Sequence, residues 1–324
     1  MFKGSVASED LSQVVRALKS AAEPTRLRLL VLLSHGELTV GELCLVLDQS
    51  QPRISRHLRV LTEAGFLDRF REQQWVYYRA PVSGRDLQWS RQLLSMIDPH
   101  STVLKHDRDR AAEVVLERAN AATQQLSRTQ PGSEEAGSRD DLACVLLEEL
   151  GPSSIGELLD IGTGSGLMLE ILGPRAEHAV GIDISAPALR LARTRVHGAG
   201  LSHCEFRRGD MYRLPCEDRS FDIVTMERVL SLAERPAAAL AEAARALRPG
   251  GRLVVIEDFE LLAARAEDNP FAQMRRWLAG AGLVAGRLRP CDLAARHFLV
   301  ALARHSTQSA AAVHATLRYT MASV

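Results

Sequence analysis

The residues of this chain best suited to chemistry are a glycine-rich turn and an acid about twenty positions after it. Residues 158–166 read Leu-Leu-Asp-Ile-Gly-Thr-Gly-Ser-Gly, and residues 180–183 read Val-Gly-Ile-Asp. Glycines let the backbone approach a ligand where a Cβ would clash, and an acid that ends the next strand can accept hydrogen bonds from ribose hydroxyls. The pair predicts a site for a cofactor that contains a nucleoside.

The spacing and order of the motifs narrow the kind of cofactor. Gly162, Gly164 and Gly166 are closer together than the glycines of the turn that holds a dinucleotide pyrophosphate, so a pyrophosphate is not required. Three further segments follow in order, at 208–211, 220–224 and 247–255. Together with the glycine turn, this series resembles the class I S-adenosylmethionine-dependent methyltransferases over roughly residues 140–303. A Rossmann-type dehydrogenase is the structural competitor.

The resemblance implies a role for each cofactor residue. The glycine turn would face the methionine part of the cofactor, and Asp160 would orient that turn or hold the amino group. Asp183 would hold the ribose, Asp210 would accept from the adenine amine, and the Met211 backbone would complete the adenine edge. The full set expected to bind S-adenosylmethionine, or its product S-adenosylhomocysteine, is Asp160, Gly162, Thr163, Gly164, Gly166, Asp183, Ile184, Asp210 and Met211.

The catalytic group is not identified by the sequence. Methyl transfer from a sulfonium is an in-line displacement with an activated leaving group, so positioning can supply much of the rate. The expected substrate segment, residues 226–232, contains no histidine. Its one acid, Glu227, is a weak candidate for accepting a substrate proton, and an ordinary surface acid is the alternative interpretation.

The N-terminal third carries a second pattern, a basic helix preceded by a short capped one. Thr39 and Glu42 form a predicted capping box for the first helix. In the second, Ile54, Leu58 and Leu61 recur with helical spacing and form a predicted buried stripe. The opposite, polar face suits a DNA major groove, with a solvated helix face as the alternative. The candidate DNA-binding residues are Ser50, Gln51, Arg53, Ser55, Arg56 and Arg59.

Two alternating runs, at 66–71 and 75–79, follow this helix and predict a β-wing. The helix, turn, second helix and wing together resemble the winged helix-turn-helix of ArsR-type bacterial repressors over about seventy residues. The resemblance implies a homodimer that binds double-stranded operator DNA at a nearly palindromic site.

The cysteines argue against a metal site. Metal-sensing ArsR-type proteins place two cysteines one residue apart in the helix before the recognition helix, whereas this chain has Cys44 alone there. One soft ligand does not hold a thiophilic ion by itself, so no metal is predicted and Cys44 is expected to pack in the core. The five cysteines show no C-x-x-C spacing, and most are expected to be small buried residues.

Length and composition favour two soluble domains. The chain has 324 residues, of which 46% are hydrophobic and 25% charged, and its formal net charge is zero. It shows neither a membrane-spanning run nor a signal-peptide pattern, so a cytoplasmic location without membrane attachment is expected. The predicted domains are a winged helix-turn-helix at 1–85, a helical connector or dimerisation segment with a linker at 86–139, a methyltransferase domain at 140–304, and a disordered tail at 305–324.

The predicted fold class is therefore α/β, with an N-terminal winged helix-turn-helix and a C-terminal Rossmann-like class I methyltransferase domain. Two functions fit this architecture. In one, a DNA-binding regulator carries an enzyme that methylates a small-molecule acceptor. In the other, the second domain is a non-catalytic sensor whose occupancy by S-adenosylmethionine or S-adenosylhomocysteine controls operator binding.

Overall fold

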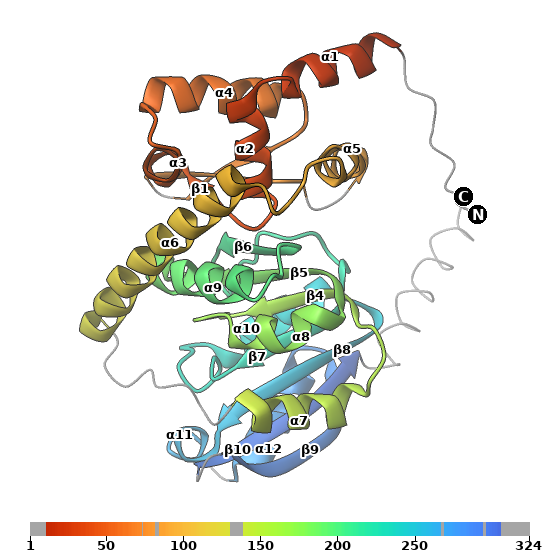
Figure 1. The fold of residues 1–324 in the computed structure, drawn as a ribbon. Coiled ribbons are helices and arrows are strands. Elements are labelled where there is room, and N and C mark those ends of the chain that lie inside the picture. The colour runs from red at the N-terminus through yellow and green to blue at the C-terminus, as the bar shows by residue number, and fades with distance from the viewer. Residues whose placement is uncertain are drawn as a thin grey trace, which may run out of the picture. The chain divides into compact units, whose positions relative to one another are not determined.

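The computed structural model describes residues 11–72, 74–81, 84–129, 139–266, 269–293 and 296–305. The chain forms two compact units, Met1–Asn120 and Ala121–Val324 (Figure 1). Two sequence-based expectations fall outside the described residues: residues 130–138 of the linker and residues 306–324 of the tail.

The N-terminal unit combines helices with a small antiparallel sheet. Its helices are α1 (Leu11–Ala21), α2 (Pro24–Leu33), α3 (Val40–Leu47), α4 (Gln51–Glu63), α5 (Gly84–Ser95) and α6 (Thr102–Thr129), the last of which continues into the second unit. Its strands are β1 (Leu38–Thr39), β2 (Asp68–Glu72) and β3 (Trp75–Arg79), paired in the order β1-β3-β2. The described part thus contains the predicted helix, turn, second helix and wing.

Local sequence rules explain the two helices at the centre of this unit. Thr39 accepts the backbone N–H of Glu42 while the Glu42 carboxylate accepts the N–H of Thr39, so the predicted capping box of α3 is confirmed. In α4 the predicted stripe of Ile54, Leu58 and Leu61 is completely buried. This burial turns the opposite face of α4 outward.

The C-terminal unit is built on one seven-stranded sheet. Its strands are β4 (Gly156–Ile161), β5 (Ala176–Asp183), β6 (Cys204–Arg208), β7 (Phe221–Glu227), β8 (Leu247–Asp258), β9 (Leu283–Leu293) and β10 (Arg296–His305). Their order is β6-β5-β4-β7-β8-β10-β9. The first five of these are mutually parallel, and β10 runs antiparallel to both β8 and β9. The carboxyl ends of four adjacent strands, β6, β5, β4 and β7, therefore meet at one edge.

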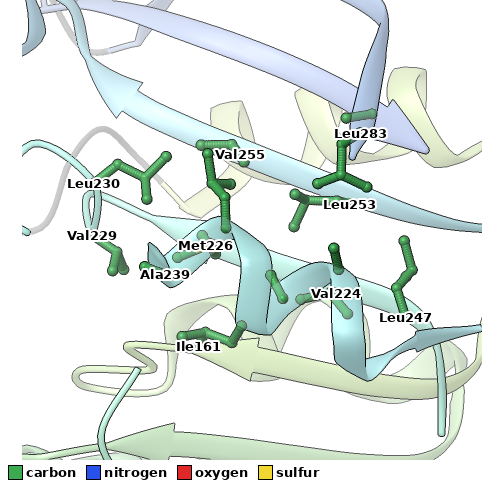
Figure 2. Close-up of a cluster of buried hydrophobic side chains, with 14 of the residues drawn as sticks. Ile161, Val224, Met226, Val229, Leu230, Ala239, Leu247, Leu253, Val255 and Leu283 are labelled. Atoms are coloured by element: carbon green, nitrogen blue, oxygen red, sulfur yellow. The ribbon is translucent and has the colours of Figure 1, made fainter. Parts of the chain in front are cut away.

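Helices cover both faces of this sheet (Figure 1). They are α7 (Arg139–Leu150), α8 (Leu167–Leu172), the 3-10 turn η1 (Gly173–Arg175), α9 (Ala186–Gly198), α10 (Pro236–Ala246), α11 (Phe259–Ala263) and α12 (Pro270–Gly280). Helices α7, α8 and α9 pack on one face, with Leu158 and Ile223 in the shared core, and α10 and α12 pack on the other, with Leu159 and Val224. Figure 2 shows part of the second core around Val224, Met226 and Val255.

Burial on both faces explains why these strands read as continuous apolar runs rather than alternating ones. Leu158 and Leu159 are neighbours in β4 that point to opposite faces, and both are fully buried. The first helix of the region expected at 140–304, α7, begins at Arg139, and the last strand of that region, β10, ends at His305. No helix within the described residues has the length and apolar character needed to cross a membrane.

Candidate functional site

The glycine turn follows β4 and requires glycine at specific positions. Gly162, Gly164 and Gly166 have φ angles of 70°, 53° and 85°, in the left-handed region that favours glycine. A Cβ added to Gly162 would lie 2.5 Å from Cγ2 of Val229, so at this position the chain also packs too closely for a side chain. The backbone of this turn is therefore shaped by close contact with the segment that follows β7.

Asp183 connects the end of β5 to this glycine turn. Its Oδ2 accepts the backbone N–H of Gly164 at 2.9 Å, and its Oδ1 accepts that of Ser185 at 2.7 Å. Burial raises the pKa of the Asp183 carboxyl, and these backbone N–H groups oppose the rise. Because each carboxylate oxygen has two lone pairs, both retain capacity to accept from a ligand hydroxyl.

Asp160 is buried beneath the turn. Its Oδ1 accepts from the Thr225 hydroxyl at 2.7 Å, whereas its Oδ2 is buried without a hydrogen-bond partner among the described residues. Burial raises the pKa of Asp160 to about 6, and the charge of Asp183 adds to the rise. The Thr225 hydroxyl opposes the rise, as does that of Thr163, which is close to the carboxyl but makes no hydrogen bond of good geometry to Oδ2. A buried oxygen that lacks a donor suits a cationic amino group, which would supply one.

The residues expected on the adenine side lie at the same edge, after β5 and β6. The N–H of Gly209 donates to the backbone oxygen of Asp183 at 3.1 Å and so joins the two segments. Asp210 is exposed, and its Oδ1 accepts the N–H of Tyr212 at 2.9 Å. Ile184, immediately after Asp183, is 62% exposed, while Met211 packs partly against the core.

The segment after β7 is held by residues that sequence reasoning missed. Glu227 is the last residue of β7 and lies at the carboxyl edge. The fully buried carboxylate of Glu257, at the corresponding end of β8, accepts the backbone N–H groups of Val229, Leu230 and Ser231. Only the register of β7 and β8, which pairs Glu227 with Ile256, brings these distant segments together.

The second candidate site is the outward face of α4. Gln51, Arg53, Arg56 and Arg59 are exposed and Ser55 is half-buried. Ser50 is the N-cap residue, but its side chain makes no capping hydrogen bond. Ser50 and Gln51 are at the start of α4, and Arg53, Arg56 and Arg59 point away from its buried stripe, as a groove-binding face requires.

His57 and Arg26 extend this face. The His57 imidazole lies 3.6 Å from Glu23, the carboxylate that caps α2 by accepting the N–H of Arg26. Burial lowers the pKa of His57, the nearby charges of Arg26, Arg53 and Arg56 lower it further, and Glu23 opposes them. Arg26, which sequence analysis did not single out, therefore belongs to the same positive cluster.

The expectation that most cysteines are buried is wrong. Among the five, Cys204 is buried, Cys144 is exposed, and the others are intermediate: Cys44, Cys216 and Cys291. Cys144 is exposed because it lies on a helix that presents only one side to the core. Cys44 does pack partly against the core of its unit, and burial raises the pKa of its thiol. The described residues contain no group of three or more His, Cys, Asp or Glu placed to hold a metal.

Comparison with known proteins assigns both units. Residues 23–69 match the family model "Bacterial regulatory protein, arsR family", and residues 159–255 match the model "Methyltransferase domain". An arsenic resistance transcriptional regulator of Pseudomonas putida is 43% identical over 98 residues, which are 30% of this chain and 75% of that protein. The chain belongs to the ArsR family of bacterial regulators. This ArsR-type regulator also carries a methyltransferase domain, and the predicted fold class is confirmed.

Other relatives match one unit at a time. The arsenical resistance operon repressor of Escherichia coli is 50% identical over 66 residues, 20% of this chain and 56% of that protein. A ubiquinone/menaquinone biosynthesis C-methyltransferase of a Ruegeria species is 34% identical over 120 residues, 36% of this chain and 48% of that protein. The chain thus spans about half the length of these two relatives. A solved SAM-dependent methyltransferase from Aquifex aeolicus is 20% identical, with a TM-score of 0.44, over 57% of this chain and 97% of that chain.

Proposed function

We propose that this ArsR-type regulator binds operator DNA through α4 and uses S-adenosylmethionine in its second domain to methylate a small molecule. The observation that carries the enzymatic part is the cofactor edge, where Asp183 accepts the N–H of Gly164 and Asp160 keeps a buried oxygen without a donor. These residues fit the cofactor for two reasons. The buried Asp160 oxygen lacks a donor, which the ammonium group would supply. The Asp183 oxygens already accept backbone N–H groups but keep lone pairs that can accept from the ribose hydroxyls.

Each side chain at this edge has a distinct role in the proposal. Asp183 holds the ribose, Asp160 accepts from the ammonium group, and the backbone of the glycine turn faces the methionine part. Asp210, Met211 and Ile184 border the adenine. When bound, S-adenosylmethionine supplies a methyl group on a positively charged sulfur that is ready to leave as a neutral thioether. The protein's contribution is therefore mainly to hold an acceptor in line with that methyl group.

Glu227 is placed to assist if the acceptor must lose a proton. It ends β7, at the same edge as Asp160 and Asp183. A carboxylate there takes a proton from the acceptor or pairs with a cationic acceptor. The acceptor itself is a small molecule.

Operator binding is assigned to the exposed face of α4. The sequence placed the dimerisation segment at residues 86–139, and α1 is proposed as a further dimer contact. The α1 residues Leu11, Val15 and Leu18 recur at helical spacing and are 76%, 39% and 50% exposed. An exposed apolar stripe on a helix is suited to burial against a second copy of the same helix. A dimer would present two α4 helices to a nearly palindromic operator.

The test of the enzymatic function is transfer of labelled methyl groups. The purified chain is incubated with methyl-labelled S-adenosylmethionine and small-molecule extract from the host, and the products are separated by mass. A labelled product that is absent with Asp183→Ala supports the enzyme. If no turnover appears while the cofactor binds, the domain is not catalytic.

A second function, cofactor sensing, is favoured by the contacts of α6. Arg118 of α6 pairs with Glu42, the capping-box acid of α3, at 3.1 Å, and Asp107 of α6 accepts two hydrogen bonds from Arg28 of α2. The helix that leads into the second unit is therefore tied to the elements that support α4. In this account, cofactor occupancy alters operator affinity through α6. Equal operator affinity with and without saturating cofactor would exclude it.

A further inference from the structure

Glu257 is a buried carboxylate that accepts hydrogen bonds from one short stretch of the chain, residues 229–231. It is the next-to-last residue of β8 and has no exposed surface, and its Oε1 accepts the N–H groups of Val229 and Leu230 at 2.9 and 2.6 Å. Its Oε2 accepts the N–H of Ser231 at 3.0 Å. Burying a carboxylate is costly unless donors replace water, so three converging N–H groups indicate a specific structural task.

The same stretch is held from its carbonyl side. The Arg265 guanidinium donates to the backbone oxygens of Leu230, Ser231 and Ala233, at 3.4, 2.5 and 2.6 Å. The stretch begins at Arg228, a non-glycine residue with φ of 56°. The backbone N–H of Arg228 donates to the backbone oxygen of Ile256. A carboxylate and a guanidinium thus fix the backbone of residues 228–233 between them.

This fixed stretch is in direct contact with the cofactor's glycine turn. Val229 lies so close to Gly162 that a Cβ on that glycine would be 2.5 Å from the Val229 methyl carbon. Val229 and Leu230 are also part of the buried cluster that contains Met226 (Figure 2). The cluster prevents Val229 from moving aside, so the position of its backbone is transmitted to the glycine turn.

We propose that Glu257 is a positioning residue of the cofactor site: by holding the N–H groups of residues 229–231, it presses Val229 against Gly162 and fixes the glycine turn in its binding shape. This inference rests on the proposed use of S-adenosylmethionine. Glu257 touches neither cofactor nor acceptor in this account. It acts through the backbone of the segment after β7, which also borders the acceptor.

The experiment compares Glu257→Gln with a matched control, Glu149→Gln. Glu149 is another buried carboxylate of the same unit, but its partner is Arg289 of β9. Calorimetry with S-adenosylhomocysteine gives the affinity, and hydrogen exchange gives the protection of amides 229–231 and 162–166. Gln has one acceptor oxygen and an NH2 group that faces N–H donors, so Glu257→Gln leaves N–H groups unpaired.

For Glu257→Gln we expect amide exchange at least about tenfold faster in both segments and affinity for S-adenosylhomocysteine at least about tenfold weaker. Glu149→Gln should leave both quantities at the wild-type values. A folded Glu257→Gln protein with wild-type exchange and affinity overturns the inference. If Glu257→Gln does not fold, Val229→Ala takes its place: faster exchange at 162–166 and weaker binding support the inference, and unchanged values overturn it.

The experiment distinguishes failure of the proposed cofactor from failure of the proposed role of Glu257. If the wild-type protein does not bind S-adenosylhomocysteine, the proposed cofactor is wrong, and the exchange of amides 162–166 still decides whether Glu257 positions the turn. If the wild-type protein binds and Glu257→Gln binds equally well, the positioning role alone is wrong.

Discussion

At the scale of single residues, the carboxyl groups of Asp160 and Asp183 differ in how their oxygens are occupied. Both oxygens of Asp183 already accept backbone N–H groups, whereas Asp160 has one oxygen that accepts from Thr225 and one without a partner. A carboxylate with preset donors is oriented before a ligand arrives. The incompletely paired one gains most from a cationic ligand.

If Asp160 binds the cofactor's ammonium group as proposed, cofactor affinity should depend on pH. Burial raises its pKa to about 6, so the carboxyl is ionised above that pH and protonated below it. An ammonium group binds the ionised form, so affinity for S-adenosylhomocysteine should be highest above pH 6 and fall as the pH drops from 7 to 5. Calorimetric titration with S-adenosylhomocysteine at several pH values between 7 and 5 measures this affinity. With Asp160→Asn the affinity should be weaker and nearly independent of pH, and a pH dependence equal to that of the wild type would contradict the assignment.

Arg56 is the residue-scale test of the DNA face. It is exposed on α4 beside Arg53 and His57, and a direct base contact is worth about 1–3 kcal/mol. Arg56→Ala should weaken binding to operator fragments selected from random DNA by that amount, as measured by fluorescence anisotropy at fixed salt. The control, Arg276→Ala, removes an arginine of α12 in the other unit. If Arg56→Ala and the wild type bind operator DNA with equal affinity, Arg56 does not contact DNA and belongs to a solvated helix face.

Residues identified from the sequence belong to contiguous motifs, and those missed act across the fold. The glycine turn and Asp183 are recognisable because a short spacing encodes them. Glu257 and Arg26 are not, because their partners are set by strand register and by helix packing. A buried Glu in an apolar run such as Val254–Glu257 is the signal that could have pointed to Glu257, since an acid is rarely buried without a purpose.

At the scale of elements, periodicity and capping signals predicted α3 and α4, whereas β1 and α1 were not predicted. β1 has only two residues and exists because Leu38 and Thr39 pair with β3, a partner that the local sequence does not contain. Helix α1 is different, because Leu11, Val15 and Leu18 recur at helical spacing and Ala21 is buried in the core. The local sequence of α1 therefore did contain a helical signal, which the sequence analysis did not use.

The capping box of α3 gives an element-scale prediction. Thr39→Ala removes the side-chain oxygen that accepts the N–H of Glu42, which should lower the free energy of unfolding of the N-terminal unit by about 1 kcal/mol. Urea titration read by hydrogen exchange of peptides from residues 24–79 reports on this unit alone. Thr39→Ser, which keeps the oxygen, should lose much less. If the two variants are equally stable, the cap is not what stabilises α3.

At the scale of the whole molecule, a DNA-binding unit and a methyltransferase-fold unit share one chain, and α6 continues from the first into the second. Sequence motifs identified both units because each is complete within its own segment. They did not predict the ion pairs Arg28–Asp107 and Arg118–Glu42, whose partners are far apart in sequence. The proposed sensing function rests on these two pairs.

Coupling between the two units predicts reciprocity. If S-adenosylhomocysteine changes operator affinity by some factor, operator DNA must change the affinity for S-adenosylhomocysteine by the same factor. Allosteric coupling is typically 5–150-fold, so we expect a change of at least about fivefold in both titrations. Arg118→Ala, which removes one pair between α6 and α3, should reduce both changes together. A change in only one of the titrations would be inconsistent with coupling at equilibrium.

The most direct measurement of the central claim, a cofactor site formed by the glycine turn and Asp183, is calorimetric titration with S-adenosylhomocysteine. The wild-type protein should bind one cofactor per chain, and Asp183→Ala should bind at least about tenfold more weakly, because charge-assisted hydrogen bonds of about 1.5–3 kcal/mol each are lost. Asp222→Ala, which removes a carboxylate that accepts the N–H of Glu157 at the opposite edge, is the control and should bind like the wild type. Absence of wild-type binding, or equal binding by Asp183→Ala, would contradict the account.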